Sequence, residues 1–147
     1  MSEAVEDKLA HAKSNAKGWY ANIREMVNAL IEAERTEAEE TTWEGDPVDE
    51  ARTAIEESVL SVRVRDGWRS PGLKHDAEPE EFEILLSTGG PALRIYGRLN
   101  EHDEPVDCEL QLQDWFTPWT RWIPDDASAD FHDYLDRFAR IFYFGEG

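Results

Sequence analysis

Apolar residues recur every three or four positions along the first quarter of the chain, which is the period of an amphipathic helix. One long helix is predicted over 8–38, with an apolar face made of Leu9, Ala12, Ala16, Trp19, Ile23, Met26, Val27, Leu30 and Ile31. Gly18 lies inside this segment and leaves open a kink or a break into two helices. Asp46 and Pro47 then predict the start of a second helix, which runs to about residue 59.

The period changes from 3.6 to 2 after this point. Alternating runs at 61–68, 81–88, 92–100 and 107–113 predict four strands, joined mainly by short turns into an antiparallel meander with one buried face. The helical period returns over 126–144, where Phe131, Tyr134, Leu135, Phe138, Ile141 and Phe142 form an apolar stripe. The pattern predicts an α+β fold with N-terminal helices, a four-stranded antiparallel sheet and a C-terminal helix packed on one sheet face.

The length of 147 residues suits one domain. We expect a single acidic α+β domain over 1–147, with a helical part at 1–60, the sheet at 61–122 and the C-terminal helix at 125–144. No apolar run approaches the length of a membrane span, and the start of the chain has no secretory signal. The sequence contains one cysteine, Cys108. These features predict a cytoplasmic protein.

The net charge of the chain limits the kinds of molecule that it can bind. The chain carries 33 Asp and Glu against 15 Lys and Arg, a formal net charge of -18. Such a field repels nucleic acids and anionic membranes and attracts basic surfaces. We therefore expect a basic protein partner, with no direct nucleic-acid or membrane binding. The alternative is that the charge serves only solubility or adaptation to a salt-rich host, as the four lysines against eleven arginines also allow.

Few residues of the sequence form a pattern typical of a catalytic, metal-binding or phosphate-binding site. His75–Asp76, His102–Asp103 and His132–Asp133 are neighbours in the sequence, but a divalent ion needs several further converging ligands. Cys108 alternates into the predicted core, which favours a structural thiol. The glycines of "STGGPA" lack the lysine and helix of a phosphate loop. We expect no metal ion, no cofactor and no catalytic residues, so the protein is not predicted to be an enzyme.

Arginines gather on the outward face of the predicted strands. Arg63, Arg65, Arg94 and Arg98 alternate to the side where Glu83, Asp107 and Glu109 also point. Cross-strand ion pairs are the simpler interpretation. The alternative is a small basic patch that would suit a phosphate or an acidic peptide.

Carboxylates are concentrated near the junction of the two N-terminal helices. At helical spacing, such carboxylates lie about 5 to 6 Å apart and can offer ion pairs to a nucleic-acid-binding cleft. A solvated helix face without a partner is the alternative. The residues predicted to bind a partner in this way are Glu32, Glu34, Glu37, Glu39, Glu40, Glu44, Asp46, Asp49 and Glu50.

Three tryptophans and a phenylalanine crowd the segment "LQLQDWFTPWTRW" at 110–122. Trp119 and Trp122 are expected to fold back beside the C-terminal helix and to cap the core. Alternatively, Trp43, Trp68 and Trp119 form a partner or dimer interface, because tryptophan is a favoured hot-spot residue.

The runs "DGWRSPG", "ILLSTGGPALRIYGRL" and "LQLQDWFTPWT" together resemble small acidic proteins of phages and mobile elements of bacteria. The likeness covers about a third of the chain. It implies an anti-defence role, such as an anti-CRISPR or anti-restriction inhibitor that mimics nucleic acid. The competing hypothesis is a small enzyme or ligand-binding domain, with a pocket between the sheet and the C-terminal helix that uses Arg94, Tyr96 or a His–Asp pair.

Overall fold

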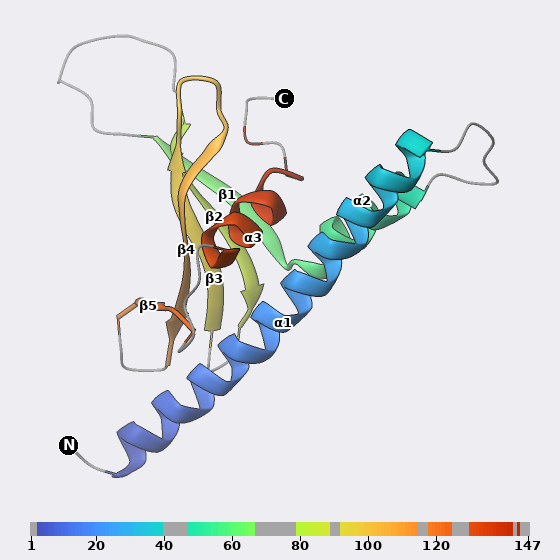
Figure 1. Cartoon of the computed structure of the whole chain (residues 1–147). Helices are drawn as coiled ribbons and strands as arrows, with labels where there is room; N and C mark the ends of the chain where they lie inside the picture. The colour runs from blue at the N-terminus through green and yellow to red at the C-terminus, as the bar shows by residue number, and fades with distance from the viewer. Residues whose placement is uncertain are drawn as a thin grey trace, which may run out of the picture.

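The computed structural model of the chain describes residues 3–39, 47–66, 79–88, 92–114, 118–124, 130–142 and 144. Helices and an antiparallel sheet form an α+β architecture, which confirms the predicted class (Figure 1). The elements in chain order are α1 (Glu3–Glu39), α2 (Pro47–Ser58), β1 (Ser61–Asp66), β2 (Pro79–Ser87), β3 (Ala92–Leu99), β4 (Pro105–Gln113), β5 (Thr120–Trp122) and α3 (Asp130–Ala139).

The sheet is a meander in the order β1-β2-β3-β4-β5, with antiparallel pairing at every step. It has five strands within the described residues, so the prediction of four strands is wrong in number. The additional strand β5 pairs Thr120 with Leu112 and Trp122 with Leu110. Its three residues are too few to show a period of two, and this is why the alternating pattern did not reveal it.

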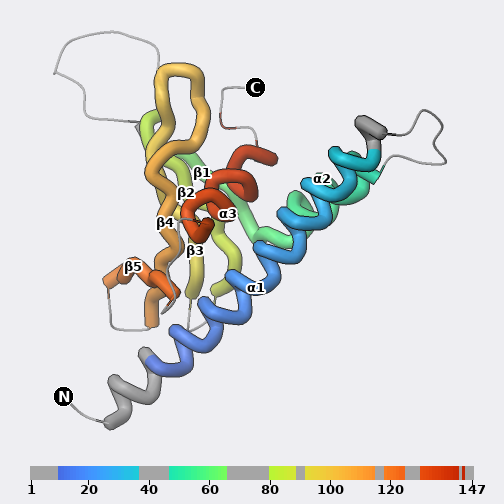
Figure 2. Tube along the Cα trace, in the orientation of Figure 1, coloured from blue at the N-terminus to red at the C-terminus, as the bar shows by residue number. Residues whose placement is uncertain are grey.

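Helix α1 continues without a break through Gly18, which settles the alternative of two helices. A methyl group at Gly18 would meet nothing within 4 Å, so neither a turn nor a close approach requires glycine there. The first half of α1 runs past the end of the sheet close to β5, whereas its second half leaves the sheet and lies beside α2 (Figures 1 and 2).

The hydrophobic core lies between one face of the sheet and the helices. Inward residues of the central strands, such as Ile95 and Leu110, are fully buried. They pack in one cluster with residues of α3 and α1, including Leu135 and Ile23. Helix α3 begins at Asp130 and ends at Ala139, so it is shorter than the predicted 126–144. Residues 125–129 lie outside the described residues.

Aromatic rings close the end of this core. Tyr20 of α1 meets Phe131 of α3 edge-on, with ring centres 4.9 Å apart. Trp122 joins the same group, 5.9 Å from Phe131 and 6.1 Å from Tyr20. The prediction that Trp122 caps the core beside the C-terminal helix is therefore confirmed.

Among the described residues, none of the helices combines the length and apolar character needed to span a bilayer.

Candidate partner-binding surface

The second half of α1 and α2 form a helical hairpin that projects beyond the sheet (Figure 1). Its two helices are held together by an apolar seam that includes Leu30, Ala33 and Ile55, all of them buried. We name residues 25–39 together with 47–58 the acidic hairpin. Because the seam occupies the inward faces, the charged side chains that are described on the hairpin point to solvent.

The carboxylates of the acidic hairpin are exposed where the structure describes them. Of the residues predicted to bind a partner, Glu32, Glu34, Asp49 and Glu50 are exposed. Three further exposed carboxylates on the hairpin were not predicted, namely Glu25, Glu56 and Glu57. Glu56 and Glu57 follow the predicted acidic run within the same helix, and this continuity was the signal that could have identified them.

Some of the residues predicted to bind a partner are described only in their backbone or not at all. Glu37 and Glu39 fall in the last turn of α1, and their side chains are outside the described part. The segment between α1 and α2 in the sequence lies outside the described residues, and it includes Glu40, Trp43, Glu44 and Asp46. Trp68, which follows β1, also lies outside them. The structure therefore places the described acidic residues on both arms of one hairpin and leaves its tip undescribed.

The carboxylates at the helix ends oppose the helix dipole. Neither α1 nor α2 has a basic residue in its last turn, and the exposed Glu56 and Glu57 lie in the last turn of α2. The C-terminus of a helix carries partial negative charge, so an acidic side chain there costs about 0.3 to 1 kcal/mol. Helix stability therefore does not explain the position of these residues.

One arginine lies within the acidic run of α1. Arg35 pairs with Glu32 at 2.6 Å, and both side chains are more than 60% exposed. The hydrogen bond and the charge of Arg35 lower the pKa of Glu32. This exposed pair neutralises Glu32 and leaves the neighbouring Glu34 as an exposed carboxylate.

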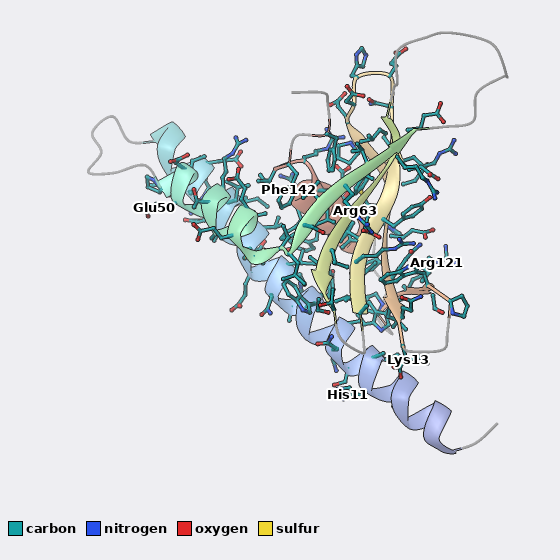
Figure 3. All side chains as sticks on the ribbon, turned by 180° about the vertical axis from the view of Figure 1, so that it is seen from behind. His11, Lys13, Glu50, Arg63, Arg121 and Phe142 are labelled. Carbon is teal, nitrogen blue, oxygen red and sulfur yellow. The ribbon has the colours of Figure 1, made fainter. Side chains whose placement is uncertain are left out.

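The face of the sheet away from the core carries the arginine-rich cluster. Figure 3 views the molecule from this side and shows Arg63 on a sheet face that no described helix covers. Glu83 of β2 lies between two arginines: Arg63 Nε donates to it at 2.8 Å and Arg94 Nη1 at 2.7 Å. Arg94 Nε also donates to Gln111 at 2.8 Å.

Glu83 is only 8% exposed, although it lies on an uncovered face. Burial alone would raise its pKa, but the hydrogen bonds and charges of Arg94 and Arg63 outweigh this and hold the pKa below its ordinary value. Beside it, Tyr96 donates to Glu81, and Arg65 pairs with the same carboxylate. These hydrogen bonds, that of Tyr96 first, lower the pKa of Glu81.

The cross-strand ion pairs are therefore confirmed for Arg63, Arg65 and Arg94. Within the described part of the chain, Arg98 and Asp107 take part in no ion pair, so the prediction is wrong for these two. A hollow of about 420 Å³ lies among the paired residues. Since glutamates already neutralise its arginines, the hollow is a poor match for the alternative of a basic patch.

Trp119 does not pack beside the C-terminal helix, so that prediction is wrong. It lies on the uncovered face, where the Arg94 guanidinium is 4.1 Å from the centre of its ring. Trp119 and Trp122 are three residues apart across β5, so alternation sends them to opposite faces of the sheet. The side chain of Trp119 is half-buried.

A groove of about 500 Å³ separates β4 from α3, where the competing hypothesis expects a pocket. It contains Cys108, His132 and Asp133, but Arg94 and Tyr96 lie on the opposite face of the sheet. Cys108 is 6% exposed, and burial, with the Asp136 carboxylate next, raises its pKa to about 12. Within the described residues, no three His, Cys, Asp or Glu side chains converge in a way that could hold a metal ion.

Of the other two His–Asp pairs, the structure describes one. His102 and Asp103 lie in the turn between β3 and β4, where His102 Nε2 is 3.5 Å from Glu101. His75 and Asp76 lie outside the described residues.

No family model, curated protein or solved structure matches this chain. The fold and the surface define it as an acidic α+β protein with a projecting, carboxylate-rich helical hairpin. The resemblance to proteins of phages and mobile elements stays a prediction.

Proposed function

We propose that the protein is an inhibitor from a phage or mobile element, whose acidic hairpin binds the basic nucleic-acid-binding surface of a host defence complex. One observation carries the proposal: α2 of the hairpin ends with the exposed carboxylates of Glu56 and Glu57, which oppose the helix dipole. From Glu32 to Glu57 the sequence has eleven carboxylates and two arginines. A binding role accounts for a charge arrangement that folding disfavours.

The mechanism is nucleic-acid mimicry. Carboxylates three or four residues apart on a helix lie about 5 to 6 Å from one another and can pair with lysines and arginines that otherwise bind phosphates. The overall charge of -18 attracts such a surface from a distance and speeds the encounter. Occupation of the cleft by the hairpin then excludes DNA or RNA.

The resemblance to proteins of mobile elements decides which targets to test first. Genes in that setting often encode proteins that blunt host defences. A CRISPR effector is our first candidate target, and a restriction complex is the second. No cofactor and no catalytic step are part of this proposal.

The test is capture of the partner by the tagged full chain. Lysate from cells that carry CRISPR and restriction systems is passed over the protein at low and high salt, and bound proteins are identified by mass spectrometry. We expect a basic nucleic-acid-binding complex that high salt or added DNA or RNA displaces, because ion pairs to phosphates weaken with salt. Capture that neither salt nor nucleic acid affects would contradict mimicry.

Matched variants then locate the binding surface. Replacement of Glu37, Glu39 and Glu40 by Gln removes two charges from the hairpin and one from the residue that follows α1, and it should abolish capture while the fold stays intact. The control E101Q/D103N/D107N removes three charges from the β3–β4 region. Asp103 and Asp107 have positive φ angles of 58° and 53°, which Asn tolerates. Equal loss of capture in both variants would assign the effect to net charge and not to the hairpin.

A further inference from the structure

Positive charge gathers in the first half of α1. Residues 8–24 contain Lys8, Lys13, Lys17 and Arg24 but no Asp or Glu, in a chain whose net charge is -18. Lys13, Lys17 and Arg24 are exposed and share one helix face, because they are four and seven residues apart. They span about 16 Å along the helix axis at 1.5 Å per residue.

This face lines a groove of about 660 Å³ between α1 and residues 122–124. Tyr20, Trp122 and Ile123 contribute aromatic and apolar surface beside the three cations. The described residues that line the groove include no Asp or Glu. Its volume falls within the range of small-molecule sites, about 300 to 1,000 Å³.

The three cations keep their charge available. No carboxylate of the described residues lies within ion-pair distance of Lys13, Lys17 or Arg24. This differs from the uncovered sheet face, where glutamates neutralise the arginines. The Arg24 guanidinium lies 5.7 Å from the ring centres of both Tyr20 and Tyr134, and such stacking orients it without neutralising it.

We propose that this groove binds an aromatic polyanion of mononucleotide size. Lys13, Lys17 and Arg24 hold its phosphate groups, and the half-buried Trp122 offers ring surface to its base. The acidic hairpin does not prevent this. The nearest described carboxylate of the hairpin is Glu25, about 12 Å from Lys17 along α1, beyond the screening length of about 8 Å at physiological salt. Glu25 directly follows Arg24, but successive residues of a helix point about 100° apart. The site goes beyond the proposed function and does not depend on it.

The size limit follows from the surrounding charge. A nucleic acid strand longer than the groove would extend over the acidic surface and be repelled. A mononucleotide places all its phosphates against the three cations and avoids that surface. The site is therefore expected to prefer a single nucleotide to a strand.

The test is isothermal titration calorimetry of the full chain with ATP, inorganic triphosphate and adenosine as probes. We expect ATP to bind, and inorganic triphosphate and adenosine each to bind at least about tenfold more weakly. The variant K13Q/K17Q should weaken ATP binding by at least about tenfold. The control R52Q/R137Q removes two exposed arginines from α2 and α3 and should change the affinity by less than about twofold.

Each of several results would overturn the proposal. Failure of ATP to bind would show that the groove is not a nucleotide site. Equal affinity for inorganic triphosphate and ATP would show that Trp122 does not contribute to binding. Tighter binding of oligothymidylate than of ATP would identify a strand-binding surface instead. A dimer in analytical ultracentrifugation that K13Q/K17Q abolishes would show that a second copy of the chain occupies the groove.

Discussion

The guanidinium of Arg94 lies 4.1 Å from the ring centre of Trp119 and is covered by that ring. The same guanidinium lies 4.7 Å from the ring centre of Tyr96. Its side chain is 16% exposed and that of its partner Glu83 is 11% exposed. Trp119 thus shields an ion pair on a sheet face that no described helix covers, while Trp122 closes the core on the other face.

Replacement of Arg94 by Ala should lower the free energy of unfolding by about 2 to 3 kcal/mol, because it leaves the Glu83 carboxylate buried with one partner fewer. Trp119→Ala should cost about 1 kcal/mol through the loss of cation–π contact. Urea unfolding measures both. The control Arg35→Ala breaks an exposed pair and should barely change the unfolding midpoint. An equal loss in Arg94→Ala and Arg35→Ala would show that burial of the pair does not matter.

The Glu83 pair should also give stability a dependence on pH. The folded pKa of Glu83 lies below its ordinary value of 4.5, so folding favours the ionised form. The resulting stability is complete above that ordinary value and is lost as the pH falls through the lowered pKa. The difference in unfolding free energy between the natural chain and Glu83→Gln should therefore shrink below about pH 4. A difference that stays constant down to about pH 2 would contradict the assignment.

The sequence allowed prediction of the elements with long periodic patterns. The face of α1 that carries Ile23 and the alternation through Ile95 were long enough to place both elements correctly. Glu83 shows what could not be predicted, because its burial depends on Arg63 and Arg94, which reach it from two neighbouring strands. Trp119 was misplaced for a similar reason, since its side of the sheet depends on a strand of three residues. The groove beside Lys17 is formed by segments about a hundred residues apart, which no local pattern relates.

Two glycines should respond in opposite directions to Ala. In Gly97→Ala the new methyl carbon would lie 2.7 Å from the Phe82 ring and 2.9 Å from the backbone oxygen of Val106. We expect a loss of about 1 to 3 kcal/mol through overpacking. Gly18→Ala meets open space in the middle of α1 and should add about 1 kcal/mol. Thermal unfolding of both variants checks the pair, and stabilisation by Gly97→Ala would contradict the close contact.

Cys108 should be unreactive in the folded protein. Its pKa of about 12 leaves about one thiol in ten thousand ionised at pH 8, and burial restricts access to it. A thiol-specific disulfide reagent should therefore react with the native chain far more slowly than with the chain unfolded in urea. Similar rates for the native and unfolded chains would show that β4 opens readily. The released thiolate anion, followed by absorbance, measures the rate.

The acidic hairpin offers a way to separate folding from binding. Replacement of Glu56 and Glu57 by Lys places cations near the C-terminus of α2, where the helix dipole favours them. We expect this variant to gain about 1 kcal/mol in stability while it loses capture of the basic partner. The control E80K/E101K makes the same change in net charge at exposed positions outside the helices, so it measures the general relief of repulsion. If Glu56 and Glu57 instead stabilised the folded state, their replacement would lower the free energy of unfolding. A variant that becomes more stable yet keeps full capture would remove these two residues from the binding surface.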